Sequence, residues 1–285
     1  MTAGYKARQA FMHSREVSDS MDNTSRIQAR WRWPAFLVLH LLALLLMTSW
    51  LAPASRPLWQ AANEALFYSL NGSLGHWPLW DWLWALSSLR VFDILVGALM
   101  LSMLIHSGWT FRAEETRSAL LHFLALLALL LVGRVLFNKL IGYFDWQHAS
   151  PSVVLAGAHH LSEQFPLLER VFELKDRSSR SFPGDHASVL LLWGLFMACF
   201  SRGWKLFAGQ LLVVLCMLPR LVAGAHWLVD VAVGGLLLAL LAFAWGYCTP
   251  LAGRMAAGLE ALYQPLLPLL TRLPLVGQWA VLQRH

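Results

Sequence analysis

The chain has 285 residues, of which 58% are hydrophobic and 13% are charged, and its formal net charge is +6. It is too apolar for an ordinary soluble domain, and apolar runs of about 14 to 22 residues recur, as in membrane spans. The positive charge suits cytoplasmic loops facing anionic lipid, and no nucleic-acid-binding motif accompanies it. The three cysteines, Cys199, Cys216 and Cys248, show no metal-ligand spacing and are interpreted as core residues.

The N-terminal region is predicted to consist of a polar tail followed by a membrane anchor. Residues 1–33 are polar and show no recurring apolar face, which predicts a mostly disordered cytoplasmic tail. The first predicted span follows at about 34–51, and a retained signal anchor is favoured over a cleaved signal peptide because no clear cleavage box follows it. Residues 55–82 hold four tryptophans and predict an amphipathic segment at the outer membrane surface.

Further apolar segments predict the remaining membrane spans, which are 84–105, 119–137, 187–200, 205–222 and 227–247. With the first span they predict an all-α integral membrane protein, a six-transmembrane-helix bundle with amphipathic interfacial helices. Arg90 and Asp93 lie near the outer end of the second span, and their spacing favours a structural ion pair within that helix. Residues 34–248 are therefore the predicted catalytic domain. The proline-interrupted segment 249–285 is expected at the interface, with a short seventh span as the alternative.

The distribution of basic residues predicts the orientation of the bundle. The tail, the 106–117 loop, the turn at Arg202 and Lys205, and Arg254 would all lie on one side. The positive-inside rule makes that side cytoplasmic, with both termini inside. The long loop 138–185 then faces outward, into the periplasm of a Gram-negative cell. That loop is also basic, but long loops count less in the rule, and a loop of this length is usually functional.

Two histidines, an arginine and an aspartate are expected to meet at the outer end of the bundle. His186 and Arg220 are separated by two antiparallel helices of about equal length, which return the chain to one membrane level. His226 begins the next helix after a short link. Asp230 follows His226 by four residues and so shares its helix face.

These residue types suit phosphoryl transfer through a phosphohistidine, without a metal or another cofactor. The carboxylate of Asp230 can accept a hydrogen bond from one ring nitrogen of His226, which leaves the other nitrogen as a nucleophile. Arg220 provides a planar fork for a phosphate. His186 opens a helix, where backbone N–H groups favour an anion, and it can protonate a leaving oxygen.

The same residues also allow a structural or a metal-binding interpretation. Arg220 and Asp230 could form an ion pair only, and His226 could be an interfacial aromatic residue. The His-x3-Asp pair could be half of a metal site, but no third ligand of matching spacing appears. Because Pro-x-x-His and Arg-x5-His-x3-Asp occur together, on helices that bring them to one level, a catalytic site is favoured.

On these motifs the chain resembles the type 2 phosphatidic acid phosphatase superfamily of membrane lipid phosphatases. Its motif Ser-Arg-x5-His-x3-Asp is matched with Pro219 in place of the serine, and its motif Pro-Ser-Gly-His is matched from Pro183 to His186. The resemblance implies that His226 is the nucleophile oriented by Asp230. It also implies that His186 is the general acid and that Arg220 is a phosphate ligand.

The superfamily's other motif, Lys-x6-Arg-Pro, is not intact. Lys139 is present, but Trp146 occupies the position of the arginine, and the nearest basic residue is His148. Arg177, Arg180 and Lys175 can substitute for it. The predicted phosphate-binding residues are Arg220, Lys175, Arg177, Arg180, Gly184, Asp185, Lys139 and His148. An extra carboxylate at Asp185 is explained either by binding of the Arg177/Arg180 loop or by contact with the acceptor.

The run Ser-Phe-Pro-Gly-Asp-His, followed later by Gly-Ala-His-Trp, resembles one subgroup of this superfamily. That subgroup transfers a phosphoryl group from undecaprenyl diphosphate to the 1-phosphate of lipid A. The resemblance implies two lipid substrates, no nucleic acid, and a site on the periplasmic face of the bacterial inner membrane. The alternatives are a phosphatase acting on undecaprenyl diphosphate or a phosphatidyl phosphate, and, in a different class, a non-enzymatic lipid-binding scaffold. No residue separates transferase from hydrolase, and the oligomeric state is left open.

Overall fold

The computed structural model describes residues 26–272 and 279–282. The helices are α2 (Trp33–Leu51), α3 (Arg56–Asn71), α4 (Pro78–Ser87), α5 (Arg90–Ile105), α6 (Ala113–Tyr143), α7 (Pro151–Val154), α8 (Leu161–Gln164), α9 (Pro166–Phe172), α10 (Asp185–Phe200), α11 (Gly203–Val222), the π-helix η1 (Asp230–Gly235), α12 (Leu236–Tyr247), α13 (Leu251–Tyr263), η2 (Gln264–Leu266), α14 (Leu267–Leu270) and η3 (Ala280–Leu282). Over these residues the one β pairing is an isolated bridge between Leu89 and Leu174.

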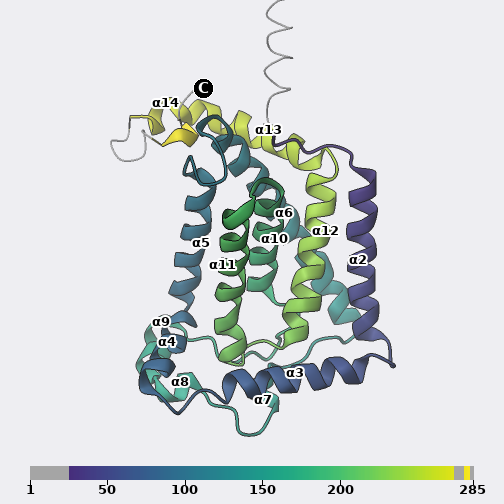
Figure 1. Ribbon diagram of the computed structural model, residues 1–285, viewed down its shortest axis with the longest axis vertical. Coiled ribbons are helices and arrows are strands. Elements are labelled where there is room, and N and C mark those ends of the chain that lie inside the picture. Colours follow the sequence, from purple (N-terminus) through teal and green to yellow (C-terminus); the bar gives the residue numbers. More distant parts are fainter. Residues whose placement is uncertain (1–25, 273–278, 283–285) are drawn as a thin grey trace, which may run out of the picture.

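The long helices run side by side and short helices close the two ends of the bundle (Figure 1). The helix α3 lies across one end, with α4 and α7 to α9 beside it, and α13 crosses the other end. Among the described residues, four helical segments are long and apolar enough to cross a membrane: α2, α6, α11 and the continuous stretch Asp230–Tyr247. The prediction of an all-α membrane protein is therefore confirmed.

The spanning segments differ in how much of their surface is covered by protein. In the stretch Asp230–Tyr247, 78% of the residues are buried, whereas in α2 the share is 11%. A helix that is apolar all round is stable only in the core of a protein or in lipid. The segment carrying α12 is thus the centre of the bundle, and α2 lies at its edge with most of its side chains facing outward.

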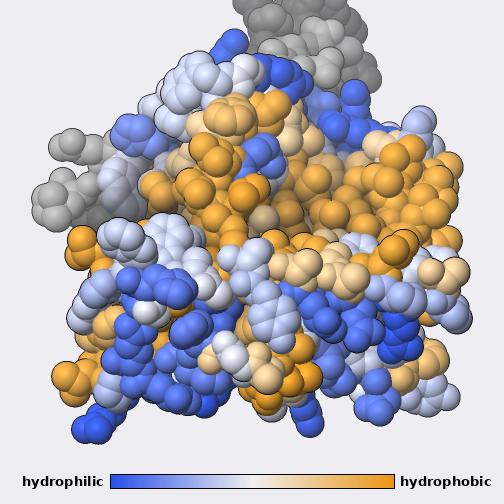
Figure 2. Space-filling model, turned by 60° about the horizontal axis from the view of Figure 1, so that its bottom comes forward, coloured by the Kyte–Doolittle hydropathy of each residue, from blue (hydrophilic) through white to orange (hydrophobic). Residues whose placement is uncertain are grey.

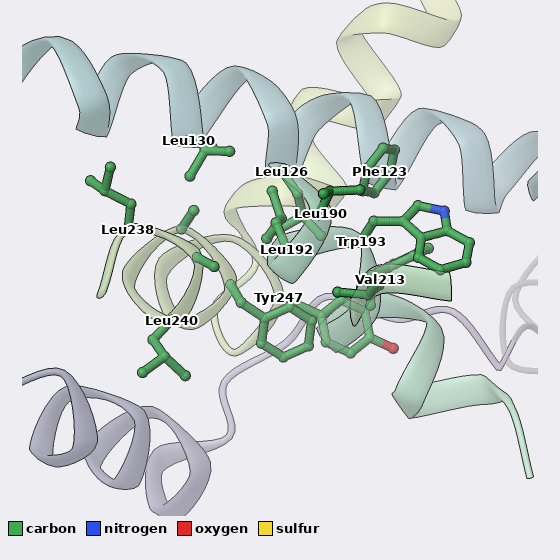
Figure 3. Close-up of a cluster of buried hydrophobic side chains, with 14 of the residues drawn as sticks. Phe123, Leu126, Leu130, Leu190, Leu192, Trp193, Val213, Leu238, Leu240 and Tyr247 are labelled. Atoms are coloured by element: carbon green, nitrogen blue, oxygen red, sulfur yellow. The ribbon is translucent and has the colours of Figure 1, made fainter. Parts of the chain in front are cut away.

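The core forms where α12 packs against α2, α6 and α10, with α11 packed on α10. Figure 3 shows the buried side chains of this cluster, which include Phe123, Leu126, Leu130, Leu190, Leu192, Trp193, Val213, Leu238, Leu240 and Tyr247. Leu192 and Trp193 have no exposed surface. Because lipid is as apolar as these side chains, their close packing, rather than escape from water, holds the helices together in a membrane.

The predicted span 84–105 is wrong at its start. The helix α4 ends at Ser87, and α5 begins at Arg90 after a short break. The break is occupied by tertiary contacts: Leu89 pairs with Leu174, and the Ser88 carbonyl accepts a hydrogen bond from the backbone N–H of Lys175 at 3.0 Å. Carbonyl groups at a helix end lack partners within the helix, and a neighbouring loop satisfies this one.

The end of the predicted tail packs on the bundle. Arg26 donates to both carboxylate oxygens of Glu115, at 2.7 and 2.6 Å, and the backbone N–H of Arg32 donates to Cys248 at 3.0 Å. Ile27 is buried. Residues 26–32 of the predicted tail are therefore ordered. Its first 25 residues lie outside the described part of the chain, as do 273–278 and 283–285 of the predicted C-terminal segment.

The two ends of the bundle carry different loops. At the end near α13, Lys205 donates through Nζ to the Gly108 carbonyl at 2.9 Å, and the Thr110 and Ser201 hydroxyls lie 3.0 Å apart. The loop 106–112 and the turn after α10 therefore lie together. At the other end, hydrophilic residues gather in front of a band of hydrophobic ones (Figure 2).

Candidate active site

A tight turn between α11 and η1 places His226 beside Arg220. The backbone N–H groups of Ala225 and His226 both donate to the Arg220 carbonyl, at 2.9 and 3.2 Å. Gly224 within this turn has a φ of 80°, and a Cβ there would lie 2.9 Å from side-chain atoms of both Phe67 and Ser152. Only glycine combines that backbone conformation with such close neighbours, so the turn depends on Gly224.

A close contact with η1 places the start of α10, and therefore His186, beside Asp230. The backbone N–H of Gly184 donates to the Asp230 carbonyl at 2.9 Å. A Cβ on Gly234 would lie 2.7 Å from the Cβ of Pro183. The Pro-Gly-Asp-His motif thus rests directly on the π-helical turn that carries Asp230, and π-helical turns often occur at functional sites.

Asp230 is fully buried and accepts three hydrogen bonds through its side chain. One oxygen accepts from His226 Nδ1 at 3.2 Å and from the Trp227 backbone N–H at 2.9 Å. The other accepts from His148 Nε2 at 2.8 Å. An ionised carboxylate only accepts hydrogen bonds, so the proton of His226 lies on Nδ1 and its Nε2 carries a lone pair. The geometry suits a nucleophilic imidazole.

His148 contacts the carboxylate of Asp230, which also holds His226. The sequence grouped it with the phosphate-binding residues, but its Nε2 is directed at Asp230. Its backbone carbonyl accepts from the Ser181 N–H at 2.9 Å, and its ring packs against Trp50 and Phe182. Spacing alone could not predict this contact, because 82 residues separate His148 from Asp230.

A second cluster forms around Asp93, on the first turn of α5. One of its oxygens accepts from Arg220 Nη2 at 2.5 Å, and the other lies 3.5 Å from His186 Nδ1. The predicted pair between Arg90 and Asp93 is wrong: Arg90 pairs with Glu173. The sequence offered one signal for Asp93, since a carboxylate inside an apolar segment is costly to bury and often functional.

His186 and Arg220 approach the same carboxylate, in agreement with the equal helix lengths that predicted a common level. The other ring nitrogen of His186, Nε2, donates to the Cys216 carbonyl at 3.1 Å. Arg220 Nη1 donates to the Ser88 carbonyl at 2.8 Å, and 7% of the Arg220 side chain is exposed. Both side chains are therefore held on several sides, with little freedom to turn.

Several predicted phosphate ligands have acidic partners. Arg177 pairs with Asp176 at 3.2 Å and with Glu163 at 3.1 Å. Burial lowers the pKa of this guanidinium, but the two carboxylates raise it overall. Lys175 lies 3.8 Å from Glu173. Arg177 therefore serves mainly to hold its own loop.

Asp185 has a partner that neither sequence interpretation named. It pairs with Arg134 of α6, and not with Arg177 or Arg180. Lys139 is exposed near the end of the same helix, and across the described residues it makes no ion pair or side-chain hydrogen bond. The extra carboxylate at the start of α10 is thus balanced by a cation from the neighbouring helix.

A cavity of about 450 Å³ opens beside the Pro-Gly-Asp-His loop. Asp185 and Pro183 form one wall, and the exposed Arg180 stands at its edge. Within residues 26–272 and 279–282, no three His, Cys, Asp or Glu side chains come together as metal ligands would.

Comparison with known proteins agrees with this geometry. Residues 124–254 match the PAP2 superfamily. The chain is also 29% identical over 232 residues to lipid A 1-diphosphate synthase of Escherichia coli (strain K12), an alignment that covers 78% of this chain and 90% of that protein. Residues 124–254 are thus similar to the PAP2 superfamily, and the chain is a lipid phosphotransferase or phosphatase, as its motifs predicted.

No solved structure matches the chain. The region that matches the superfamily contains both histidine motifs, Arg220 and His148. Asp93 precedes that region, although its carboxylate lies inside the cluster.

Proposed function

We propose that this enzyme moves the terminal phosphoryl group of undecaprenyl diphosphate onto the 1-phosphate of lipid A. The observation that carries the proposal is the pair of His226 and buried Asp230, which leaves His226 Nε2 free to attack phosphorus. The similarity to a lipid A 1-diphosphate synthase supports lipid A as the acceptor. The donor is proposed from the motif resemblance.

In the first step, His226 Nε2 attacks the terminal phosphorus of the donor. The bond between that phosphorus and the bridging oxygen breaks, and His186 donates a proton to the leaving oxygen. Undecaprenyl phosphate departs, and a phosphohistidine remains. Asp230 stabilises the positive charge that develops on the His226 ring.

In the second step, an oxygen of the lipid A 1-phosphate attacks the same phosphorus. The N–P bond breaks, Nε2 recovers its electron pair, and His186 takes up the proton carried by the acceptor phosphate. The product is lipid A 1-diphosphate. Arg220 is the proposed ligand of the transferred phosphate, and Arg180 at the edge of the cavity is the proposed contact for a substrate headgroup.

We further propose that the bundle crosses the bacterial inner membrane six times and that the site faces the periplasm. The four long segments are joined in this proposal by α5 and α10, each of 16 residues. At about 1.5 Å per residue these two helices are short for a bilayer core of about 30 Å. The residues that flank each helix would complete its path across the bilayer.

The proposal is tested by incubating purified protein with undecaprenyl diphosphate labelled in its terminal phosphate, with and without lipid A. We expect label to pass to lipid A, with little free phosphate while acceptor is present. Acid-labile phosphate trapped on the protein should map to His226. A His226→Ala variant is expected to abolish both signals. If free phosphate is released at the same rate with and without lipid A, the result would contradict phosphoryl transfer and favour the lipid phosphatase.

A further inference from the structure

We propose that Asp93 is a positioning residue of the active site, which holds the proton donor His186 and the phosphate ligand Arg220 from a third helix. This inference rests on the roles that the proposed function gives to those two residues. It assigns a role in positioning the active site to α5, which lies outside the region matching the superfamily.

The contacts of Asp93 join the two groups that must act on the same phosphate. Its Oδ2 accepts from Arg220 at 2.5 Å, and its Oδ1 lies 3.5 Å from His186 Nδ1. One carboxylate therefore sets the distance between the guanidinium and the imidazole. A misplacement of such groups by about 1 Å can cost about 100-fold in rate.

The ring of His186 is orientated by contacts on both of its nitrogens. Its Nε2 donates to the Cys216 carbonyl at 3.1 Å, so Nδ1 is the nitrogen that faces Asp93. A negative charge beside Nδ1 stabilises the imidazolium that His186 must become before it donates a proton. Asp93 is one-third exposed, with 34% of its side chain accessible, so a substrate oxygen can approach the same side.

Arg220 depends on Asp93 for its counter-ion. Its side chain is 7% exposed, and its other hydrogen bonds go to neutral carbonyls, those of Ser88 at 2.8 Å and Lys175 at 3.4 Å. A buried cation needs an ionised partner. In the described part of the chain, Asp93 is the carboxylate that pairs with it.

The break between α4 and α5 makes this arrangement possible. Because α4 ends at Ser87, the carbonyl of Ser88 is available to accept from Arg220, and α5 begins at Arg90 with Asp93 on its first turn. A helix continuous from 84 to 105 would have used that carbonyl internally. The Ser88 carbonyl at the helix break and the Asp93 carboxylate therefore both accept hydrogen bonds from Arg220.

The test compares two small substrates that differ mainly in their leaving group, phenyl phosphate and 4-nitrophenyl phosphate. Nitrophenolate departs readily without a proton, whereas phenolate needs a proton donor. In Asp93→Asn, which keeps an oxygen for Arg220 but loses the charge, we expect kcat on phenyl phosphate to fall at least about 10-fold more than on 4-nitrophenyl phosphate. His226→Ala should lose both reactions.

Controls separate positioning from stability. Arg90, one turn away on the same helix, pairs with Glu173 in the described part of the chain, and Arg90→Gln should leave both rates within about 2-fold of the parent. If Asp93→Asn does not fold, as judged by thermal unfolding in detergent, Asp93→Glu replaces it, since it moves the carboxylate and should give the same unequal loss.

Two outcomes would overturn the proposal. Equal losses on the two substrates in a folded variant would show that Asp93 does not act through His186. A lower KM with unchanged kcat would show that Asp93 competes with the substrate phosphate for Arg220. Neither result depends on lipid A, so failure of the proposed transfer would be recognised separately, by the labelled-donor assay.

Discussion

The buried side chain of Asp230 contacts both the proposed nucleophile, His226, and His148 of the long loop. It accepts from His226, from His148 and from the Trp227 backbone, so each of its oxygens is used. The contact with His226 is readable in the sequence, because residues four apart share a helix face. The contact with His148 is not, since it depends on where a long loop returns to the bundle. The carboxylate both orients the nucleophile and ties that loop to the core.

Replacing Asp230 by Asn should therefore impair both activity and stability. An amide nitrogen in place of one oxygen would face an N–H donor, and a buried unsatisfied donor costs about 1–3 kcal/mol. We expect kcat to fall by at least about 100-fold, as in other dyads that lose the orienting carboxylate. Phosphoenzyme formation and thermal unfolding measure the two effects. Glu114 is an exposed carboxylate near the opposite end, and Glu114→Gln should change neither phosphoenzyme formation nor thermal unfolding. A near-normal kcat in Asp230→Asn would refute the proposed pair of His226 and Asp230.

The helices contribute mainly through their ends. His186 lies in the first turn of α10, Arg220 lies in the last turn of α11, and Asp230 begins η1. Helix interiors were predicted well from apolar periodicity, because burial against lipid or core needs no specific partner. The ends were predicted less well: the break at 88–89 depends on Leu174 and Lys175, which are distant in sequence.

The contact between η1 and the Pro-Gly-Asp-His loop predicts an effect of Gly234→Ala. Its Cβ would lie 2.7–2.9 Å from atoms of Phe182 and Pro183, including the backbone of Pro183, so the loop and η1 must move apart. We expect a loss of about 1–3 kcal/mol in unfolding free energy and at least about 10-fold in kcat. Gly133→Ala, in α6 with no atom within 4 Å of the added Cβ, is the matched control and should not destabilise. Equal behaviour of the two variants would argue against close packing at Gly234.

The arrangement of the entire bundle separates two chemically different ends. At the α13 end lie basic residues of the tail and of a turn, including Arg26 and Lys205, which the positive-inside rule assigns to the cytoplasm. The opposite end holds both histidine clusters, the cavity and the long loop. A span count taken from length alone stops at four, because α5 and α10 are short. Their role as spans remains a prediction.

Cysteine labelling in intact cells tests the orientation. In a variant lacking Cys199, Cys216 and Cys248, we expect Ser179→Cys, exposed in the long loop, to react with a membrane-impermeant maleimide from the periplasm. Ser107→Cys, exposed at the other end, should react only after the inner membrane is permeabilised. The reverse pattern would place the site in the cytoplasm and contradict the proposed access to lipid A on the periplasmic face.

By itself the sequence determined the all-α membrane class, the superfamily motifs and the meeting of His186 and Arg220 at one level, because apolar periodicity, residue spacing and helix length are local quantities. Tertiary structure decided which partners those residues have. Asp93 pairs with Arg220, Asp185 with Arg134, and His148 with Asp230, whereas the sequence suggested other partners or none. Ion pairs between distant segments depend on how helices pack, and spacing along one chain does not encode that packing.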